Sequence, residues 1–180
     1  MNFCRHIKLM AAYNVWMNTK VYEVAAKLTP AALGRDRQAF FKSIQGTLNH
    51  IAVADTMWLK RFALHSAGSA VFDPIRQIAM PTTLDQVLFT DFGALSEYRK
   101  LLDATITAWV ELLTENDFEQ LFDYTTTKGV ATRKRLSGVV LHFFNHQTHH
   151  RGQVTTQLSQ AGCDVGGTDL LVLIPNEIQI

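Results

Sequence analysis

The chain has 180 residues, of which 47% are hydrophobic and 18% are charged, so it is not a disordered chain and can bury the core of one domain over residues 1–180. Seventeen Lys and Arg against sixteen Asp and Glu leave a formal net charge of +1. Nucleic-acid binding depends on a basic surface, so this balance argues against a nucleic-acid partner.

The first two long segments have the spacing of amphipathic helices. Residues 3–28 carry apolar side chains at helical steps and contain neither Pro nor Gly. We expect this helix to end before Pro30, since proline disfavours helix in the residue that precedes it. A linker with Gly34 follows. The second helix is predicted over residues 43–65, with Ser43 as its N-cap.

The middle of the chain predicts a loop, a third helix and a hairpin. Gly and Pro residues in 66–81 are typical of a loop or short turns. Residues 84–114 keep a three-to-four-residue apolar period, which predicts a long helix with Thr83 as a candidate cap. In residues 121–133, alternation around Gly129 indicates a short β-hairpin.

A fourth long helix is predicted over residues 136–161, ending at Gly162, a residue type common just beyond helix ends. Within it only Arg151 carries a formal charge, which favours a central helix packed inside the protein. The apolar residues 170–174 are expected to pack as an extended segment on the helices. Four long helices with short connections predict an all-α fold, a four-helix bundle with the short β-hairpin before its last helix.

Four of the seven histidines lie within nine residues of the fourth helix. At about 100° per residue, His146 and His150 lie at the margin of its apolar stripe, while His142 and His149 are rotated further away. Imidazoles at positions i and i+4 can share a metal ion. Because Gln147 follows His146 where a zinc protease has Glu, the sequence does not favour a metalloprotease.

A catalytic metal usually has three protein ligands, so a third must come from another helix. His50 is the best candidate, since it lies at the margin of the apolar stripe of the second helix; His6 and His65, near helix ends, are weaker. A hydrogen-bonded core histidine remains the alternative for each of them. The tryptophans are more typical of a core than of a cofactor site. They are Trp16, Trp58 and Trp109.

The compartment follows from what the chain lacks. Two cysteines, Cys4 and Cys163, are too few for a secreted disulfide scaffold, so reduced thiols are expected. The N-terminal segment has no apolar signal-peptide core, and no stretch approaches the roughly 18–20 apolar residues of a membrane span. We therefore expect a cytoplasmic protein that does not contact membranes.

Three segments resemble motifs of the DinB family, which is grouped with YfiT-like metal-dependent enzymes. Residues 145–153, Asn-His-Gln-Thr-His-His-Arg-Gly-Gln, resemble the family signature. Residues 13–18 are similar to its first-helix motif, and residues 43–62 are similar to its second-helix motif. The resemblance covers nearly the whole chain, in the order of the family.

The resemblance implies a four-helix bundle with a three-histidine metal site. The ligands of the family correspond to His50, His146 and His150, and the ion would be zinc or nickel. Members often form homodimers, so a homodimer is expected. Some relatives are S-transferases that use a low-molecular-weight thiol, which implies such a thiol as a cosubstrate and a small molecule as the substrate.

Three readings of the function follow. Three neutral imidazoles leave the charge of a divalent ion uncompensated, so it would activate bound water or a bound thiol, for a hydrolase or an S-transferase. No second catalytic residue is evident. A non-catalytic metal-binding stress-response module is the alternative, and a DNA-repair factor, suggested by the family name, is disfavoured by the charge. Residues that could contact the metal ligands or the substrate are Asp55, Arg61, Arg151 and Gln153.

Overall fold

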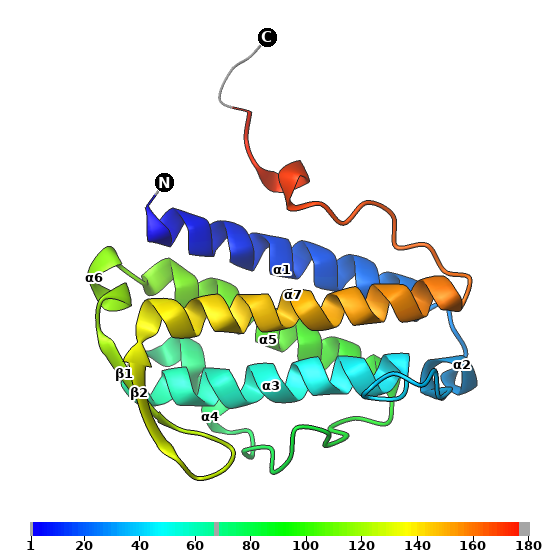
Figure 1. Cartoon of the computed structure of the whole chain (residues 1–180), viewed down its shortest axis with the longest axis horizontal. Helices are drawn as coiled ribbons and strands as arrows, with labels where there is room; N and C mark the ends of the chain where they lie inside the picture. The colour runs from blue at the N-terminus through cyan, green and yellow to red at the C-terminus, as the bar shows by residue number, and fades with distance from the viewer. Residues whose placement is uncertain (1, 67–68, 177–180) are drawn as a thin grey trace.

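The computed structural model describes residues 2–66 and 69–176, and its long helices pack side by side as a bundle (Figure 1). The helix α1 packs against α5 and α7, and α3 packs against the same two helices, so α1 and α3 lie at opposite corners. The predicted four-helix bundle is confirmed. Its helices are α1 (Phe3–Ala25), α3 (Ile44–His65), α5 (Phe92–Leu112) and α7 (Leu136–Gln160).

The first helix is shorter than predicted, because it ends at Ala25 and a turn follows. The expected linker contains a five-residue helix, α2 (Pro30–Gly34). The side chain of Thr29 accepts a hydrogen bond from Ala32 N, and Pro30 occupies the first helical position, where its missing N–H has no cost.

The start of α3 is as predicted. The hydroxyl of Ser43 accepts a hydrogen bond from the Gly46 N–H at 3.0 Å, which caps the helix. The expected loop or turns after α3 contain a 3₁₀ turn, η1 (Ala70–Phe72), and a single helical turn, α4 (Asp73–Arg76). Within this loop, residues 67–68 lie outside the described residues.

The start predicted for the third long helix is wrong, because α5 begins at Phe92 and not at residue 84. Asp91 caps it, accepting from Ala94 N at 2.7 Å. The preceding segment is not helical, since the Asn49 side-chain oxygen accepts from the backbone N–H groups of Leu88 and Phe89, and Leu84 is 44% exposed. A side chain of α3 thus takes backbone donors that a helix would use.

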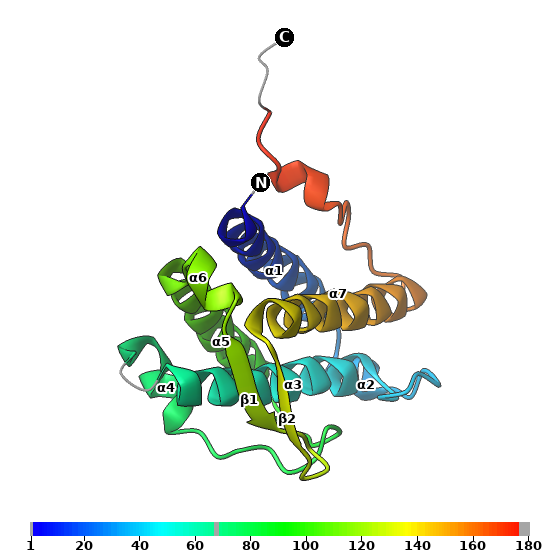
Figure 2. The ribbon, with the colours of Figure 1, turned by 60° about the vertical axis from the view of Figure 1, so that its left-hand side comes forward.

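The predicted hairpin is confirmed, although its second strand extends to Arg135. Strands β1 (Leu121–Thr125) and β2 (Ala131–Arg135) pair antiparallel, with Leu121 opposite Arg135. Gly129 allows the tight turn, with a φ of 77°. The hairpin and the single turn α6 (Glu115–Phe118) lie at one end of the bundle (Figures 1 and 2).

The last helix ends as predicted, whereas the structure of the tail that follows it differs from the prediction. Gly162 has a φ of 80°, and the Cys163 N–H donates to Leu158 O at 2.9 Å, a Schellman motif. The tail runs back along α1 (Figure 1), where the Tyr13 hydroxyl donates to Thr168 O at 2.7 Å. It contains a 3₁₀ turn, η2 (Leu170–Leu173), in place of the expected extended segment.

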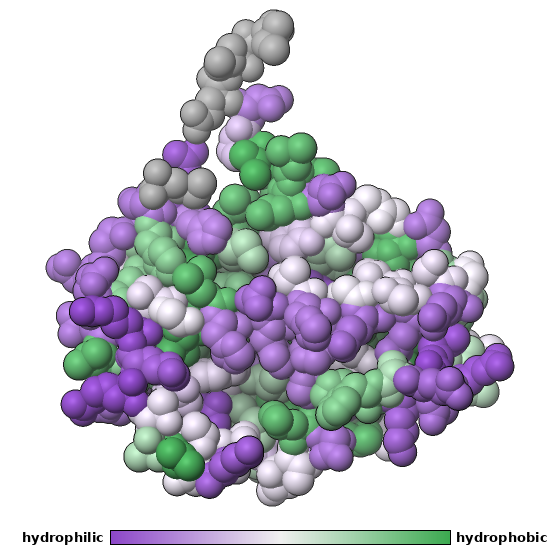
Figure 3. Space-filling model, viewed as in Figure 1, coloured by the Kyte–Doolittle hydropathy of each residue, from purple (hydrophilic) through white to green (hydrophobic). Residues whose placement is uncertain are grey.

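The helix α7 is buried on one face and exposed on the other, which corrects the expectation that its low charge reflects a central position inside the protein. Phe143 and Val154 are buried, whereas Asn145, Thr148 and Gly152 are exposed. A hydrophilic band crosses the molecule over α7 in Figure 3. The outer face of α7 is therefore polar but uncharged.

The core fills the space between the helices. Trp58 and Trp109 are buried, and Trp16 is partly buried against the core, in line with their expected roles. Among the helices of the described residues, none combines the length and the apolar character that a membrane span requires.

Candidate metal centre

Three histidines from two helices meet between α3 and α7. His50 lies on α3, and His146 and His150 lie one turn apart on α7. The Nε2 atom of His50 is 3.3 Å from Nε2 of His146 and 3.1 Å from Nε2 of His150. One ligand atom from each of the three lies within 4.8 Å of the others, so this three-histidine cluster can hold a metal ion.

Hydrogen bonds at Nδ1 orient two of the three rings. Nδ1 of His50 lies 2.7 Å from the carbonyl oxygen of Leu84, which can only accept, so Nδ1 donates. Nδ1 of His150 donates in the same way to the Gln153 side-chain oxygen at 2.8 Å. In both neutral rings the lone pair is therefore on Nε2, the nitrogen that faces the centre of the cluster.

The spacing of these nitrogens fits a tetrahedral metal ion. Zinc binds imidazole nitrogen at about 2.0–2.1 Å, which places two tetrahedral ligands about 3.3–3.4 Å apart. The two Nε2–Nε2 distances from His50, 3.3 Å and 3.1 Å, are close to that value. Two lone pairs at such a distance repel each other unless a cation or a proton lies between them, so the donor set fits a divalent ion.

Burial keeps the cluster neutral. Loss of solvent, with a smaller contribution from the neighbouring imidazoles, lowers the pKa of His146 to about 3. Burial also lowers the pKa of His50 to about 4, against the opposing effect of its bond to Leu84 O. The pKa of His150 is lowered by burial as well. Neutral imidazole is the form that binds metal, so at pH 7 the three histidines are in the protonation state that can bind a metal ion.

An aromatic ring covers one side of the cluster. Phe41 stacks on His50 with ring centroids 3.8 Å apart, and it forms a T-shaped pair with His150, with centroids 5.6 Å apart. The backbone there lies so close to α3 that a Cβ on Gly46 would be 2.2 Å from the Phe41 carbonyl oxygen. Phe41 was not predicted from the sequence; the signal for it is Gly46, a glycine in the first turn of a predicted helix.

The other histidines lie outside the cluster. His142 and His149 are exposed on α7, as expected from their rotation. His149 contacts the Gln153 side chain at 3.2 Å, and His142 packs against Trp58. His65 hydrogen-bonds to the carbonyl of Asp123 at 2.7 Å, and so belongs to the hairpin end of the bundle. The remaining candidate, His6, lies next to Phe3 near the start of α1.

Of the four proposed contact residues, only Gln153 hydrogen-bonds to a histidine of the cluster. Arg61 packs over Trp58 at 4.7 Å and carries no ion pair in the described part of the chain. Asp55 and Arg151 are completely or almost completely buried elsewhere in the bundle.

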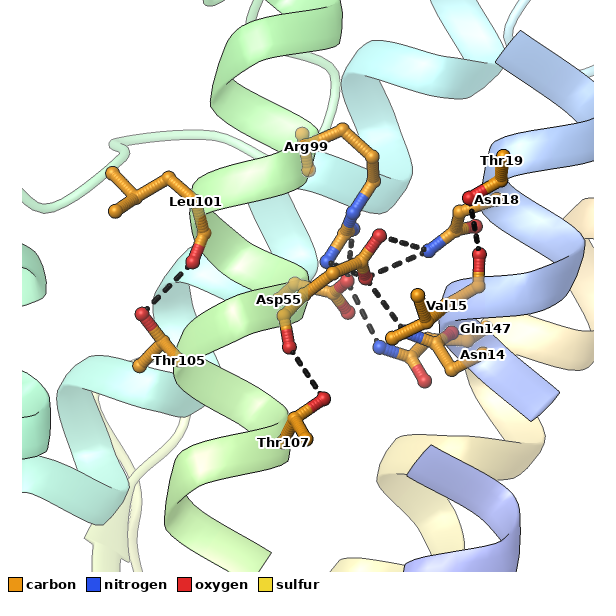
Figure 4. Close-up of polar contacts among 12 residues, drawn as sticks. Asn14, Val15, Asn18, Thr19, Asp55, Arg99, Leu101, Thr105, Thr107 and Gln147 are labelled. Carbon is orange, nitrogen blue, oxygen red and sulfur yellow. Dashed lines mark hydrogen bonds and ion pairs between the residues drawn. The ribbon is translucent and has the colours of Figure 1, made fainter. Parts of the chain in front are cut away.

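Asp55 belongs to a buried polar network that joins all four long helices (Figure 4). One Asp55 oxygen accepts from Arg99 at 2.5 Å and from Gln147 at 2.9 Å. Asp103 lies on the other side of Arg99 and accepts from Asn18 at 2.9 Å. Arg99 and Asp103 were not predicted from the sequence, because charged residues on a long helix are usually exposed.

Comparisons with known proteins agree with this geometry. The DinB family model matches residues 3–178. Protein DinB of Bacillus subtilis (strain 168) is 24% identical over 158 residues, which cover 87% of each chain. The crystal structure of a DinB-like protein from Bacillus cereus ATCC 10987 superposes with a TM-score of 0.58 at 23% identity, covering 85% of this chain and 91% of that one. The fold is therefore shared with that structure.

Proposed function

Since this chain belongs to the DinB family, we propose that it binds one divalent metal ion through His50, His146 and His150 and acts as a metal-dependent enzyme on a small molecule. The convergence of three imidazole nitrogens within 4.8 Å carries the proposal. Zinc fits the observed nitrogen spacing, and nickel is the other ion we propose, because imidazole binds both.

The reaction we propose is of S-transferase or hydrolase type. A divalent ion held by three neutral ligands supplies a positive charge that lowers the pKa of a bound thiol or water. The chain's own part is to fix that centre: Leu84 O and the Gln153 side chain hold the ring protons of His50 and His150 away from it. Phe41 covers one face of His50 and excludes water there.

A non-catalytic metal-binding module is the second candidate. Within the described part of the chain, no carboxylate hydrogen-bonds to any of the three imidazoles, and the buried acid Asp55 is hydrogen-bonded to Arg99 and Gln147. A protein without a positioned general base can still bind metal without turning over a substrate.

Metal analysis of purified variants tests the proposal. His50→Gln, His146→Gln and His150→Gln should each lose stoichiometric metal, because two ligands hold a divalent ion weakly. His142→Gln is the matched control, since His142 lies on the same helix outside the cluster, and it should keep its metal. Full metal retention in all three variants would contradict the site.

An activity assay separates the two candidates. Metal-loaded wild-type protein is incubated with low-molecular-weight thiols and a model electrophile, and separately with activated esters. Turnover of either substrate that is lost in His146→Gln supports the enzyme. Tight metal binding with no turnover of any substrate supports the non-catalytic module.

A further inference from the structure

A groove of about 460 Å³ runs beside the three-histidine cluster. One wall is the segment 37–40, which lies between α2 and α3, and the other is the C-terminal half of α7, including His149 and Gln153. Gln153 also accepts the Nδ1 proton of His150. The groove therefore begins at a residue that touches a proposed ligand, and its volume is in the range of small-molecule sites.

The charge of the groove is positive. Among the described residues that line it, Arg37 is the only one with a formal charge and none is acidic. The guanidinium donates to the backbone oxygen of Ala32 at 3.3 Å, and no carboxylate pairs with it within the described ranges. The neighbouring Asp36 instead accepts from the backbone N–H of Gln38 at 2.8 Å. The charge of Arg37 is thus uncompensated.

Two buried side-chain atoms of residues that line the groove lack a hydrogen-bond partner among residues 2–66 and 69–176. They are Nε of Arg37, a donor, and the side-chain oxygen of Gln157, an acceptor. Gln157 is 3% exposed, and its amide nitrogen is already used by Thr47 at 3.1 Å. Because an unpaired buried polar group is costly, the pair indicates a site that a ligand with both acceptor and donor groups would complete.

The loop that carries Arg37 is held in a strained conformation. Gln38 and Lys42 have φ angles of 58° and 64°, in the left-handed region that favours glycine. The Arg37 N–H donates to Lys42 O at 2.7 Å and closes the turn. Phe40, 86% exposed, stands in the groove wall. Strain of this kind persists where the surroundings fix it, and it is commonly found at ligand sites.

We propose that this groove binds the oxyanion group, a carboxylate or a phosphate, of the small molecule on which the metal centre acts. Arg37 pairs with the oxyanion, and the Gln157 side-chain oxygen accepts a hydrogen bond from an N–H or O–H of the same molecule. The rest of the ligand then extends past Gln153 toward His150. The role as a substrate site rests on the proposed function, whereas anion binding itself does not.

Titration calorimetry with three probes tests the proposal. The probes are N-acetyl-alanyl-alanine, which has a free carboxylate, its neutral C-terminal amide, and N-acetyl-phosphoserine amide. Each is titrated into metal-free and zinc-loaded wild-type protein. At least one anionic probe should bind about tenfold more tightly than the neutral amide. The anion that binds more tightly identifies the oxyanion as carboxylate or phosphate.

Matched variants locate the binding. Arg37→Gln should weaken the anionic probe about tenfold, and Gln157→Leu should weaken it as well. Arg35→Gln is the control, because Arg35 is exposed two residues before Arg37 and its loss changes the charge equally. Circular dichroism verifies that each variant is folded. If Arg37→Gln does not fold, the change in affinity of Gln157→Leu for the anionic probe tests the proposal.

Three results would overturn the proposal. These are equal binding of the neutral and anionic probes, no binding of either anion, and an equal loss in the Arg35→Gln and Arg37→Gln variants. Anion binding to the metal-free protein, combined with histidine variants that keep full metal, would refute the proposed metal site and leave the anion site standing. The two failures are therefore distinguishable.

Discussion

Gln153 is the residue that connects the three-histidine cluster to the groove. Its side-chain oxygen accepts the Nδ1 proton of His150 at 2.8 Å, and its nitrogen lies 3.2 Å from His149. Such partners fix the tautomer of a ligand histidine, and their loss typically weakens metal binding by about 10–100-fold. We expect Gln153→Leu to weaken zinc binding by that factor, as measured by competition with a chelator. Gln77→Leu, at an exposed position, is the control, and equal affinities would contradict the role.

The metal-free protein should lose stability as the pH falls from 7 toward 4. Burial holds the pKa values of His50 and His146 at about 4 and 3, below the ordinary 6.5, so the unfolded chain binds protons that the folded chain does not. The contribution of these residues is fully present above pH 6.5 and is lost during acidification. Thermal unfolding in the presence of a chelator should show a falling Tm, with a shallower fall in His146→Gln. Parallel pH profiles of the two proteins would contradict this.

At the scale of single residues, the sequence predicted the pair on α7 better than the rest of the site. Helical spacing alone placed His146 and His150 on one side, because both belong to one element. To predict His50 as the third ligand, one must know which helices pack together. The spacing therefore favoured His50 over the other histidines but did not establish it as a ligand. Phe41 and Arg37 were not predicted, since their positions depend on a loop with left-handed residues that no periodicity reports.

The segment before α3 depends on a single missing Cβ. A methyl group on Gly46 would lie 2.2 Å from the Phe41 carbonyl oxygen, a backbone atom that cannot turn aside. We expect Gly46→Ala to displace this segment, to cost about 1–3 kcal/mol in the free energy of unfolding, and to separate Phe41 from His50. Loss of the ring-current shift of His50 in an NMR spectrum would report that separation.

Gly138→Ala is the matched control for this change. Gly138 lies within α7 and has no atom within 4 Å of an added Cβ. Alanine there should stabilise the protein by up to about 1 kcal/mol, since glycine is a poor helix former. A Gly46→Ala variant that is as stable as wild type, with an unchanged His50 signal, would show that the segment does not depend on this contact.

At the scale of elements, the hydrophobic period correctly predicted that each long helix exists. It misplaced the start of α5, where a side chain distant in the sequence binds the backbone and prevents a helix. The apolar spacing from Leu84 continues into α5, so the period alone does not mark the start, and Asp91, the residue that caps the helix, is the only local signal for it. The reason for the difference lies in α3, where Asn49 binds two backbone N–H groups of that segment and His50 binds the Leu84 carbonyl. The segment that was wrongly predicted to be helical therefore also orients a proposed metal ligand, His50.

At the scale of the whole molecule, one buried network joins the four long helices. Asp55 comes from α3, Arg99 and Asp103 from α5, Asn18 from α1 and Gln147 from α7 (Figure 4). Such groups are satisfied only when all four helices are in one register, so we infer that the network specifies how the bundle packs. Because Gln147 follows His146, the same register sets the position of the ligands on α7.

Replacement of Arg99, the charged side chain at the centre of the network, tests this inference. Arg99→Met removes the cation that forms ion pairs with both Asp55 and Asp103, and loss of one member of a buried ion pair typically costs about 3–5 kcal/mol. Urea unfolding should show that loss. Lys100→Met is the adjacent control, since its pair with Glu97 is exposed and contributes little to stability. Equal midpoints for the two variants would mean that packing of the apolar core alone sets the register, and that the network follows from the fold without specifying it.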